Sequence, residues 1–594
     1  MSVQPLRAAA IAAAVSGGQT TAEAVARDTL TRIEAYAAAQ PAVWITRCAE
    51  SAVLAAARRV DAHLAAGETL PLAGVPFAIK DNIDLAGVPT TAACPDFAYT
   101  PKASADVVER LVAAGAIPIG KTNLDQFATG LNGTRSPYGA PACVFNRSYI
   151  SGGSSSGSAV AVAAGLVPFA LGSDTAGSGR VPAAFNGLIG LKPSKGRWST
   201  SGLVPACRSL DCISLFTHDI ADARLVDSVV AGFDPADGYS RPIENRSISG
   251  RRIGVPRANQ RLFLGDTAAE YLYGAALDAL AIAGFELVEI DIAPLQEAAR
   301  LLYDGPWIAE RSAAVWDLLH ERTEAIDPVV EPILRAGLSV SGVDVFRGQY
   351  RLAELQQAAS TMWAEVGMLA LPTAPTIYRI REMRAAPVAL NSQLGLYTNF
   401  VNLLDMAAIA LPAGFRDNRT GFGITLIGPA ATDRALIAAS EAYLEAARLP
   451  PSPPVELETA METVKLAVVG AHLAGMPLHW QLTSRDARPL GPAFTAPTYR
   501  LYAMADSVPP KPALVHAADG GAIAIEVYEL DIAAFGSFVA EVPAPLAIGT
   551  VTLADGSTVK GFVAEPRAII GAEDITELGG WRAFVQSGSR GGAD

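Results

Sequence analysis

The sequence predicts an α/β fold, a mixed β-sheet core covered by helices, followed by a small β-rich α+β domain. Short apolar runs of strand length alternate with helical patterns over most of the chain, and a proline-rich segment then leads into several short strand candidates. The chain has 594 residues. Single cores stop growing near about 250–300 residues, so we expect a domain at 1–447, a linker at 448–463 and a second domain at 464–594.

The elements of the first domain follow from hydrophobic periodicity. Helical spacing of apolar residues covers 1–65, 106–114, 267–283 and 295–320. Strand candidates are the apolar runs at 75–80, 116–121, 187–192, 252–255, 367–375 and 407–412. The stretch 151–182 has two Gly/Ser loops on either side of AVAVAAGLVPFAL, which predicts a buried helix that turns into a buried strand.

The boundary between the domains is the segment RLPPSPP at 448–454. Its four prolines continue neither a helix nor a sheet, and such a segment behaves as a semi-rigid spacer. Beyond it, short strand candidates lie at 465–470, 499–504, 522–529 and 550–553. The turn signals DGG at 519–521 and DG at 555–556 separate them.

Composition narrows the class of protein. Half of the residues are hydrophobic and 18% are charged, which is typical of a packed globular protein. The net charge of −13 argues against nucleic acid and anionic membranes as partners, but is compatible with a small anionic substrate. Five cysteines without a C-x-x-C pair, no histidine metal motif and no long apolar run favour a cytoplasmic enzyme with no metal or other cofactor.

The two Gly/Ser loops favour acyl-transfer chemistry. Glycines allow backbone N–H groups to approach an oxyanion closely, and a serine can serve as the nucleophile. No G-x-S-x-G elbow followed by a suitable histidine is evident. A lysine can replace the histidine base when burial lowers its pKa, and Lys80 lies at the end of an apolar strand candidate.

These loops and GVPFAIKDN at 74–82 resemble the amidase signature family, through GGSSSGSA at 152–159 and GSDTAGSGRVPAAFNGLIGLKPSKG at 172–196. The resemblance implies the amidase signature fold and a Ser-cis-Ser-Lys catalytic set. In that set Ser178 is the acyl nucleophile, Ser154 the bridging serine and Lys80 the base. The resemblance also implies an oxyanion hole made by backbone N–H groups of Thr175, Ala176, Gly177 and Ser178.

Two further segments, FATGLNGTRSPYG at 127–139 and LYDGPWIAER at 302–311, look like the allophanate hydrolase subfamily. There, a tyrosine and an arginine eight positions apart hold the substrate, and Tyr303 and Arg311 match that spacing. A guanidinium fork suits the carboxylate of allophanate. On one helix, eight positions bring both side chains near one face.

The predicted second domain resembles the C-terminal domain of allophanate hydrolases, which has a γ-glutamyl cyclotransferase-like fold. The segments that carry this resemblance are VVGAHLAGMPLH at 468–479, AFGSF at 534–538 and VKGF at 559–562. It implies two steps: deamination of allophanate to N-carboxycarbamate in the first domain, and decarboxylation in the second. The candidates for the second site are His472 and His479.

Other functions remain open at the level of sequence. A broad-specificity amidase or the amidotransferase subunit that acts on charged transfer RNA shares the first domain, and an inactive scaffold is the alternative without catalysis. We expect a homodimer, the commonest symmetric assembly. Without a biotin-attachment or G-x-x-x-x-G-K-[ST] motif, we expect a functional link to a separate urea carboxylase, or to a biuret hydrolase that supplies allophanate from cyanuric acid.

Overall fold

The computed structural model describes residues 6–248, 250–455, 463–504 and 507–588. The chain forms two compact units, Met1–Leu457 and Glu458–Asp594, and each is described by itself. The predicted linker at 448–463 falls partly on 456–462, outside the described residues. The predicted domain limits therefore stay a prediction.

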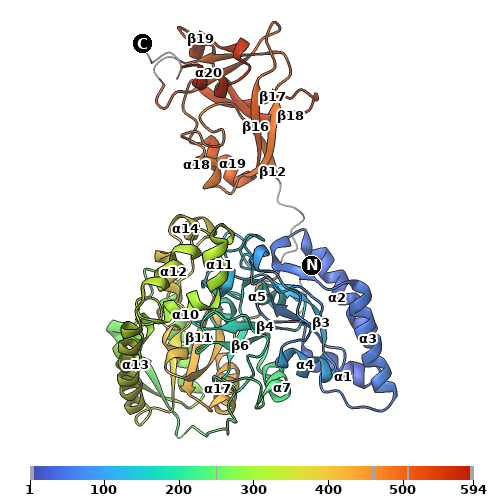
Figure 1. The fold of residues 1–594 in the computed structure, drawn as a ribbon, viewed down its shortest axis with the longest axis vertical. Helices are drawn as coiled ribbons and strands as arrows, with labels where there is room; N and C mark the ends of the chain where they lie inside the picture. Colours follow the sequence, from blue (N-terminus) through green and yellow to red (C-terminus); the bar gives the residue numbers. More distant parts are fainter. Residues whose placement is uncertain (1–5, 249, 456–462, 505–506, 589–594) are drawn as a thin grey trace. The chain divides into compact units, whose positions relative to one another are not determined.

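The first unit is built on one eleven-stranded mixed sheet, seen in the lower body of Figure 1. Its strands are β1 (Trp44–Arg47), β2 (Pro76–Lys80), β3 (Ile117–Thr122), β4 (Phe169–Asp174), β5 (Ile189–Lys192), β6 (Cys212–Thr217), β7 (Arg252–Pro256), β8 (Glu286–Ile290), β9 (Met368–Pro372), β10 (Met406–Phe415) and β11 (Gly421–Pro429). Their order is β1-β3-β2-β4-β6-β5-β10-β11-β9-β7-β8. The α/β class predicted from the alternation of strands and helices is confirmed.

Strand β2 lies between β3 and β4 and runs parallel to both. The register pairs Phe77 with Phe169 and Ile79 with Leu171. Because the carboxyl ends of parallel strands meet at one edge of a sheet, the ends of β2 and β4 meet there. That edge carries Lys80 from β2 and the loop that follows β4.

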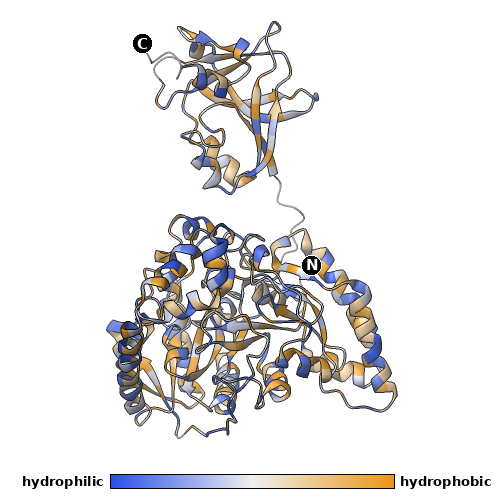
Figure 2. Cartoon of the chain, viewed as in Figure 1, coloured by the Kyte–Doolittle hydropathy of each residue, from blue (hydrophilic) through white to orange (hydrophobic). Residues whose placement is uncertain are grey.

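Helices cover the sheet. They are α1 (Ala8–Ser16), α2 (Ala22–Ala37), α3 (Glu50–Ala65), α4 (Asp106–Ala113), α5 (Ser156–Ala163), α6 (Val181–Phe185), α7 (Ile220–Val230), α8 (Thr267–Ile282), α9 (Ala293–Arg300), α10 (Trp307–Ala314), α11 (Trp316–Glu321), α12 (Val330–Ala336), α13 (Gly342–Met362), α14 (Ile380–Ala385), α15 (Ala389–Leu394), α16 (Phe400–Leu403) and α17 (Asp433–Ala447). Figure 2 shows apolar and hydrophilic residues following one another along the outer helices α2 and α3, as expected for helices with one buried face.

Alternate residues of β2 pack in two different hydrophobic clusters. Phe77 and Ile79 pack in a cluster with residues of α4, α7, α8 and α17. Ala78 packs in a second cluster with residues of α2, α3 and α5. Since successive side chains of a strand point to opposite faces, helices cover this part of the sheet on both sides and Lys80 ends a strand that is buried throughout.

Two expectations for the first unit are wrong. Residues 1–65 are not all helical, because Trp44–Arg47 forms β1, antiparallel to β3. The helix expected over 295–320 is broken into α9, α10 and α11, and Tyr303 lies in the turn before α10. Pro306 follows Gly305 at this break, and proline has no N–H group with which to continue a helix.

The second unit has the expected β-rich α+β composition. Its strands are β12 (Thr463–Val468), β13 (Arg488–Phe494), β14 (Tyr499–Ala503), β15 (Pro512–His516), β16 (Ala524–Asp531), β17 (Leu546–Thr552), β18 (Thr558–Ala564) and β19 (Glu573–Asp574). They form a five-stranded sheet, β13-β16-β12-β18-β17, and a three-stranded sheet, β15-β14-β19. Its helices are α18 (Trp480–Thr483), α19 (Ile532–Val539) and α20 (Trp581–Gly588). Among the described residues of both units, no helix is long and apolar enough to cross a membrane.

Strand β5 packs directly on the loop that follows β4, and this contact generates a prediction about stability. A Cβ atom on Gly190 would lie 2.2 Å from the carbonyl oxygen of Gly179. Gly190→Ala therefore forces a backbone shift, and overpacking of this kind costs about 1–3 kcal/mol of folding free energy. We expect thermal unfolding of the Gly190→Ala variant to begin several degrees below that of the unsubstituted protein.

The matched control is Gly274→Ala on α8, where a Cβ atom meets nothing within 4 Å. A helical glycine replaced by alanine without a clash is stabilising by about 0.4–1 kcal/mol. Equal unfolding temperatures for the two variants, measured by differential scanning calorimetry, would contradict the predicted overpacking.

Candidate active site

Lys80 is the fully buried centre of the site. Its Nζ atom lies 2.7 Å from Ser154 Oγ and 2.7 Å from Ser173 Oγ. Burial lowers the pKa of Lys80 to about 7, against the carboxylates of Asp125, Asp211 and Asp174, which raise it. A large fraction of this amine is therefore neutral near pH 7, and a neutral amine can accept a proton.

The loop before α5 presents Ser154. The peptide bond between Gly153 and Ser154 is cis. Only glycine fits at position 153, since a Cβ atom there would lie 2.2 Å from Asp125 Oδ2. The backbone N–H of Asp125 donates to the Ser154 carbonyl oxygen (3.1 Å). Asp125 therefore contacts the loop both at Gly153 and at Ser154.

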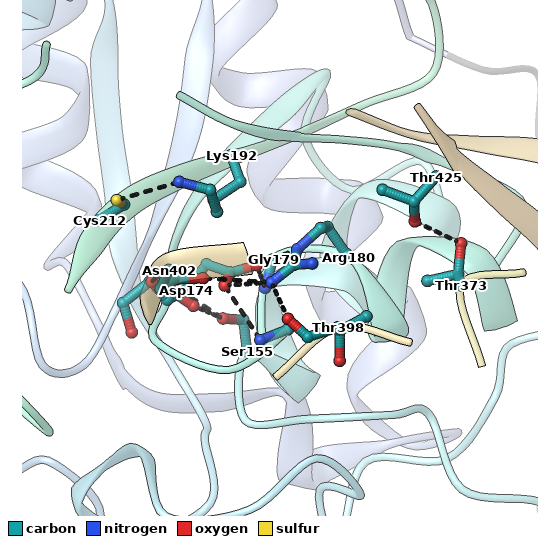
Figure 3. A network of polar contacts seen from close by, with 12 residues as sticks. Ser155, Asp174, Gly179, Arg180, Lys192, Cys212, Thr373, Thr398, Asn402 and Thr425 are labelled. Carbon is teal, nitrogen blue, oxygen red and sulfur yellow. Dashed lines mark hydrogen bonds and ion pairs between the residues drawn. The ribbon is translucent and has the colours of Figure 1, made fainter. Parts of the chain in front are cut away.

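The loop after β4 carries Ser178, which is 2% exposed. It is shaped by the buried carboxylate of Asp174, which accepts the N–H groups of Gly177 and Gly179, each at 3.0 Å. Arg180 donates to the same carboxylate through Nε and Nη2, each at 2.9 Å (Figure 3). Burial raises the pKa of Asp174, but Arg180, Lys192 and the N–H group of Gly179 together outweigh burial and lower the pKa, so the carboxylate stays ionised as an anchor.

The guanidinium of Arg180 is itself anchored. Its Nη2 lies 3.2 Å from the carbonyl oxygen of Thr398 and 3.3 Å from Asn402 Oδ1. Figure 3 shows Arg180, Asp174 and Asn402 close together beside Gly179. A buried ion pair therefore helps to set the position of Ser178, together with the glycines on either side of it, where a Cβ atom would lie within 2.5 Å of another side chain.

Not all predicted oxyanion donors are available. The Gly177 N–H is used by Asp174, which leaves the N–H groups of Thr175, Ala176 and Ser178 as candidates. The Thr175 hydroxyl donates to Asp211, which also accepts the N–H groups of Ala206 and Cys207. Burial raises the pKa of Asp211 to about 6.

Ser173 is a site residue that the sequence reasoning missed. It lies within β4, and its hydroxyl oxygen contacts Lys80 Nζ and accepts a hydrogen bond from Asn82 Nδ2 at 3.2 Å. The parallel register of β2 and β4, which pairs Ile79 with Leu171, brings the next residues of both strands together. A sequence that predicts both strands but not their pairing gives no signal for this contact.

Tyr303 and Arg311 meet although they do not share a helix. Arg311 Cζ lies 5.1 Å from the centre of the Tyr303 ring, a cation–π distance. The Arg311 side chain is buried, and its Nη1 donates to Thr129 Oγ1 at 3.2 Å. Its Nε and Nη2 atoms have no hydrogen-bond partner among the described residues.

Tyr303 and Arg311 lie near the loop that follows β4 and carries Ser178, the predicted nucleophile; this loop is called the nucleophile loop below. Leu302 and Trp307 share one apolar cluster with Ala176, and Tyr303 packs against that cluster. Asp211, which binds Thr175, is among the charges that raise the pKa of Arg311 against the opposing effect of burial. The arrangement offers two free guanidinium donors beside a serine loop.

In the second unit, the structure separates the two candidate histidines. His472 lines a cavity of about 230 Å³, together with Lys511, Phe538 and Phe562. His479 is not among the residues that line this cavity, and its Nε2 lies 3.1 Å from the Tyr528 hydroxyl. His472 is therefore the candidate that faces a possible ligand space.

Comparisons with known proteins agree with both units. The family model described as Amidase matches residues 25–437, and the model described as Allophanate hydrolase C-terminal domain matches residues 464–586. Urea amidolyase of Saccharomyces cerevisiae is 44% identical over 87% of this chain and 30% of the yeast protein. The chain thus spans about a third of the length of the urea amidolyases that it matches.

A second relative and a solved structure are also similar to this chain. One glutamyl-tRNA(Gln) amidotransferase subunit, from Chloroflexus aggregans, is 34% identical over 72% of this chain and 94% of that protein. The solved structure of allophanate hydrolase from Kluyveromyces lactis has a TM-score of 0.67 and 41% identity, and covers 95% of this chain and 97% of that one. The chain belongs to the amidase family, has the amidase signature fold and carries the C-terminal domain of allophanate hydrolases.

Proposed function

We propose that this chain hydrolyses allophanate (urea-1-carboxylate) to ammonia and carbon dioxide. The observation that carries the proposal is the guanidinium of Arg311, which is buried next to the nucleophile loop with Nε and Nη2 unpartnered among the described residues. A buried cation with two free donors is costly unless a ligand satisfies it. The carboxylate of allophanate can accept from both donors and balance the positive charge, whereas an uncharged amide can accept a hydrogen bond but leaves the charge unbalanced.

In the proposed first step, neutral Lys80 takes a proton from Ser154, which takes one from Ser178. Ser178 Oγ attacks the amide carbon, and N–H groups of the nucleophile loop stabilise the oxyanion. The tetrahedral intermediate collapses as the relay returns the proton to the departing nitrogen, which leaves as ammonia. Water then attacks the acyl-enzyme and releases N-carboxycarbamate.

In the proposed second step, the C-terminal domain at 464–594 decarboxylates N-carboxycarbamate to carbamate, which decays to ammonia and carbon dioxide. His472 is our candidate for this site, because it lines the cavity of its unit and His479 does not. The division at the 448–463 linker is supported by two family models that end at 437 and begin at 464.

We also propose the setting in which the chain works. A functional link to urea carboxylation, on the same polypeptide or another, is supported by the relatives that are called urea amidolyases; biuret hydrolysis is the other source of allophanate. A cytoplasmic homodimer remains the expected form. The exposed apolar side chains of Val343, Phe346 and Tyr350 on α13 support an interface between copies, which a monomer in sedimentation velocity would contradict.

The role of Ser178 is tested by Ser178→Ala. The variant removes one oxygen atom from a loop that Asp174 and Arg180 hold in place, so we expect an unchanged fold by circular dichroism. Ammonia release from allophanate should fall by at least about a thousandfold, since the nucleophile is lost. A variant that retains a tenth of the rate would refute the assignment.

The role of Lys80 is tested by the pH dependence of kcat/KM for ammonia release. With a pKa of about 7, the neutral amine gains about fivefold in population from pH 6 to 7 and about twofold from pH 7 to 8. We expect the rate to follow this rise, after subtraction of the enzyme-free reaction at each pH. Lys80→Arg, which stays charged, should be inactive throughout.

Asp211→Asn is the control for Asp211 itself, because its pKa of about 6 lies in the same pH range as that of Lys80. The Asp211 carboxylate raises the pKa of Lys80, so its removal should shift the midpoint of the profile to lower pH. A profile that stays flat from pH 6 to 8 in the unsubstituted protein, or a midpoint that moves upward in Asp211→Asn, would contradict the role of Lys80 as the base.

The role of Arg311 is tested by binding in the Ser178→Ala background. Malonamate keeps a carboxylate and malonamide replaces it with a second amide. Arg311→Met should weaken malonamate binding by at least about a hundredfold, because two charge-assisted hydrogen bonds are lost. Malonamide binding should change by no more than about threefold.

Arg311→Lys is the second variant, since it keeps the positive charge and removes the planar guanidinium group that can donate two parallel hydrogen bonds. We expect it to bind malonamate more tightly than Arg311→Met does and more weakly than the parent. Calorimetric titration gives all of these constants. Equal losses for malonamate and malonamide would contradict carboxylate recognition by Arg311 and favour a broad-specificity amidase.

A further inference from the structure

A chain of hydrogen bonds runs behind His472 in the second unit. His472 Nε2 lies 2.7 Å from Gln481 Oε1, and Gln481 Nε2 donates to Glu541 Oε2 at 3.2 Å. The other carboxylate oxygen of Glu541 pairs with the guanidinium of Arg485, which also donates to the Gln481 carbonyl oxygen at 2.9 Å. Gln481 is thus held through both its side chain and its backbone.

The hydrogen bonds that link His472, Gln481 and Glu541 allow only one assignment of donors and acceptors. The Glu541 carboxylate, which pairs with Arg485, only accepts hydrogen bonds, so the amide nitrogen of Gln481 must face it. The amide oxygen then faces His472, and an amide oxygen also only accepts. His472 Nε2 must therefore carry the hydrogen, and in the neutral ring Nδ1 is left with a lone pair.

The ring of His472 is held against rotation. It stacks on Phe562 with centroids 5.0 Å apart and planes 19° apart, and it meets the edge of Phe538 at 5.1 Å. All three rings line the cavity. Among the described residues no group forms a hydrogen bond with Nδ1, so this atom is available to a molecule in the cavity.

We infer that Gln481, oriented by Glu541, is a positioning residue that fixes the tautomer of His472 and makes Nδ1 the atom that exchanges a proton with the substrate. The inference rests on the proposed decarboxylation in this unit, and it names the atom that performs the proton transfer. Neither Gln481 nor Glu541 touches the reacting atoms in this scheme. Their effect passes through the imidazole.

The proton balance explains why Nδ1 matters. N-carboxycarbamate is a dianion, and loss of carbon dioxide breaks a C–N bond whose electron pair stays on nitrogen. One proton must reach that nitrogen, which yields carbamate with one negative charge and neutral carbon dioxide. In the proposed step the imidazolium of His472 gives this proton from Nδ1, returns to its neutral form and is reprotonated from water.

The surroundings of His472 suit this cycle. Burial, assisted by the charges of Lys511 and Arg485 and by His479, lowers the pKa of His472, while the bond to Gln481 raises it. The resting ring is therefore neutral at pH 7. An incoming dianion offsets the positive charge of Lys511, which lines the same cavity, and favours protonation of Nδ1 as the substrate binds.

The tautomer can be measured on the full chain without substrate. The protein has six histidines, and ¹⁵N-ring-labelled histidine with the spectrum of His472→Asn subtracted identifies the His472 signals. We expect the Nε2–H form alone in the unsubstituted protein. Glu541→Gln frees the Gln481 amide to turn and should give a mixture of the two tautomers.

Exchanging the two side chains, Gln481 and Glu541, should restore the single tautomer of His472. In Gln481→Glu combined with Glu541→Gln, the new carboxylate at position 481 accepts from both neighbours, so the Nε2–H form should return. A mixture of tautomers in the unsubstituted protein, or an unchanged single tautomer in Glu541→Gln, would overturn the inference.

Turnover of ¹³C-labelled allophanate separates this inference from the proposed function. We expect ¹³C NMR to show at least a tenfold accumulation of N-carboxycarbamate in His472→Asn and in Gln481→Leu, with the first release of ammonia unchanged. Tyr528→Phe removes the matching partner of His479, which does not line the cavity, and should cause no accumulation.

The outcomes are distinct. No accumulation in His472→Asn would refute the proposed second step itself. Accumulation in His472→Asn but not in Gln481→Leu or Glu541→Gln would leave the second step standing and overturn the positioning role of Gln481.

Discussion

The burial of one amine at the end of β2 is the constraint on which the catalytic unit depends. Helices pack on both faces of the sheet around β2, so Lys80 has no access to water and burial lowers its pKa to about 7. Three carboxylates act against burial, but each is committed elsewhere: Asp174 pairs with Arg180, Asp211 binds Thr175, and Asp125 accepts backbone N–H groups. Because no carboxylate is left to pair with the amine, burial prevails.

The same carboxylates also give the loops their shape. Asp125 accepts the N–H groups of Asn132, Gly133 and Arg135 and leaves no room for a side chain at position 153. Asp174 draws the N–H groups on both sides of Ser178 toward itself. The positions of Ser154 and Ser178 and the lowered pKa of Lys80 therefore depend on the same carboxylates. A substitution at one of these carboxylates therefore changes geometry and proton affinity together: the change in geometry alters the size of the rate, and the change in the pKa of Lys80 moves the midpoint of its pH profile.

Local patterns in the sequence were sufficient to predict β2, β3, β5, β7, β9 and β10 and the helix and strand between the two loops, since each buries an apolar run. The buried strands β6 and β11 were not among the predicted strands. They were not sufficient where a contact joins distant segments. Ser173 reaches Lys80 only through the register of β2 and β4, and Arg311 reaches Thr129 across 182 positions. The helix expected at 295–320 failed because Pro306 interrupts a periodicity that persists on both sides of it. Motif resemblance supplied the names of the catalytic residues, whereas the commitments of Asp174 and Asp211 appear only in three dimensions.

In both units an acceptor-only group orients a side-chain amide near a residue of the proposed site. In the first, Asn82 Nδ2 faces the carbonyl oxygen of Val204, which only accepts, and the same nitrogen donates to Ser173 Oγ beside Lys80. In the second, Gln481 Nε2 faces a carboxylate, so its oxygen faces the ring of His472. A side-chain amide has two chemically different ends, and an acceptor-only group fixes which end meets the other neighbour: the nitrogen of Asn82 meets Ser173, and the oxygen of Gln481 meets His472. The direction of each network is thus set outside Lys80 and His472, the groups proposed to transfer the proton, and a substitution of Asn82 or Gln481 leaves both of those side chains in place.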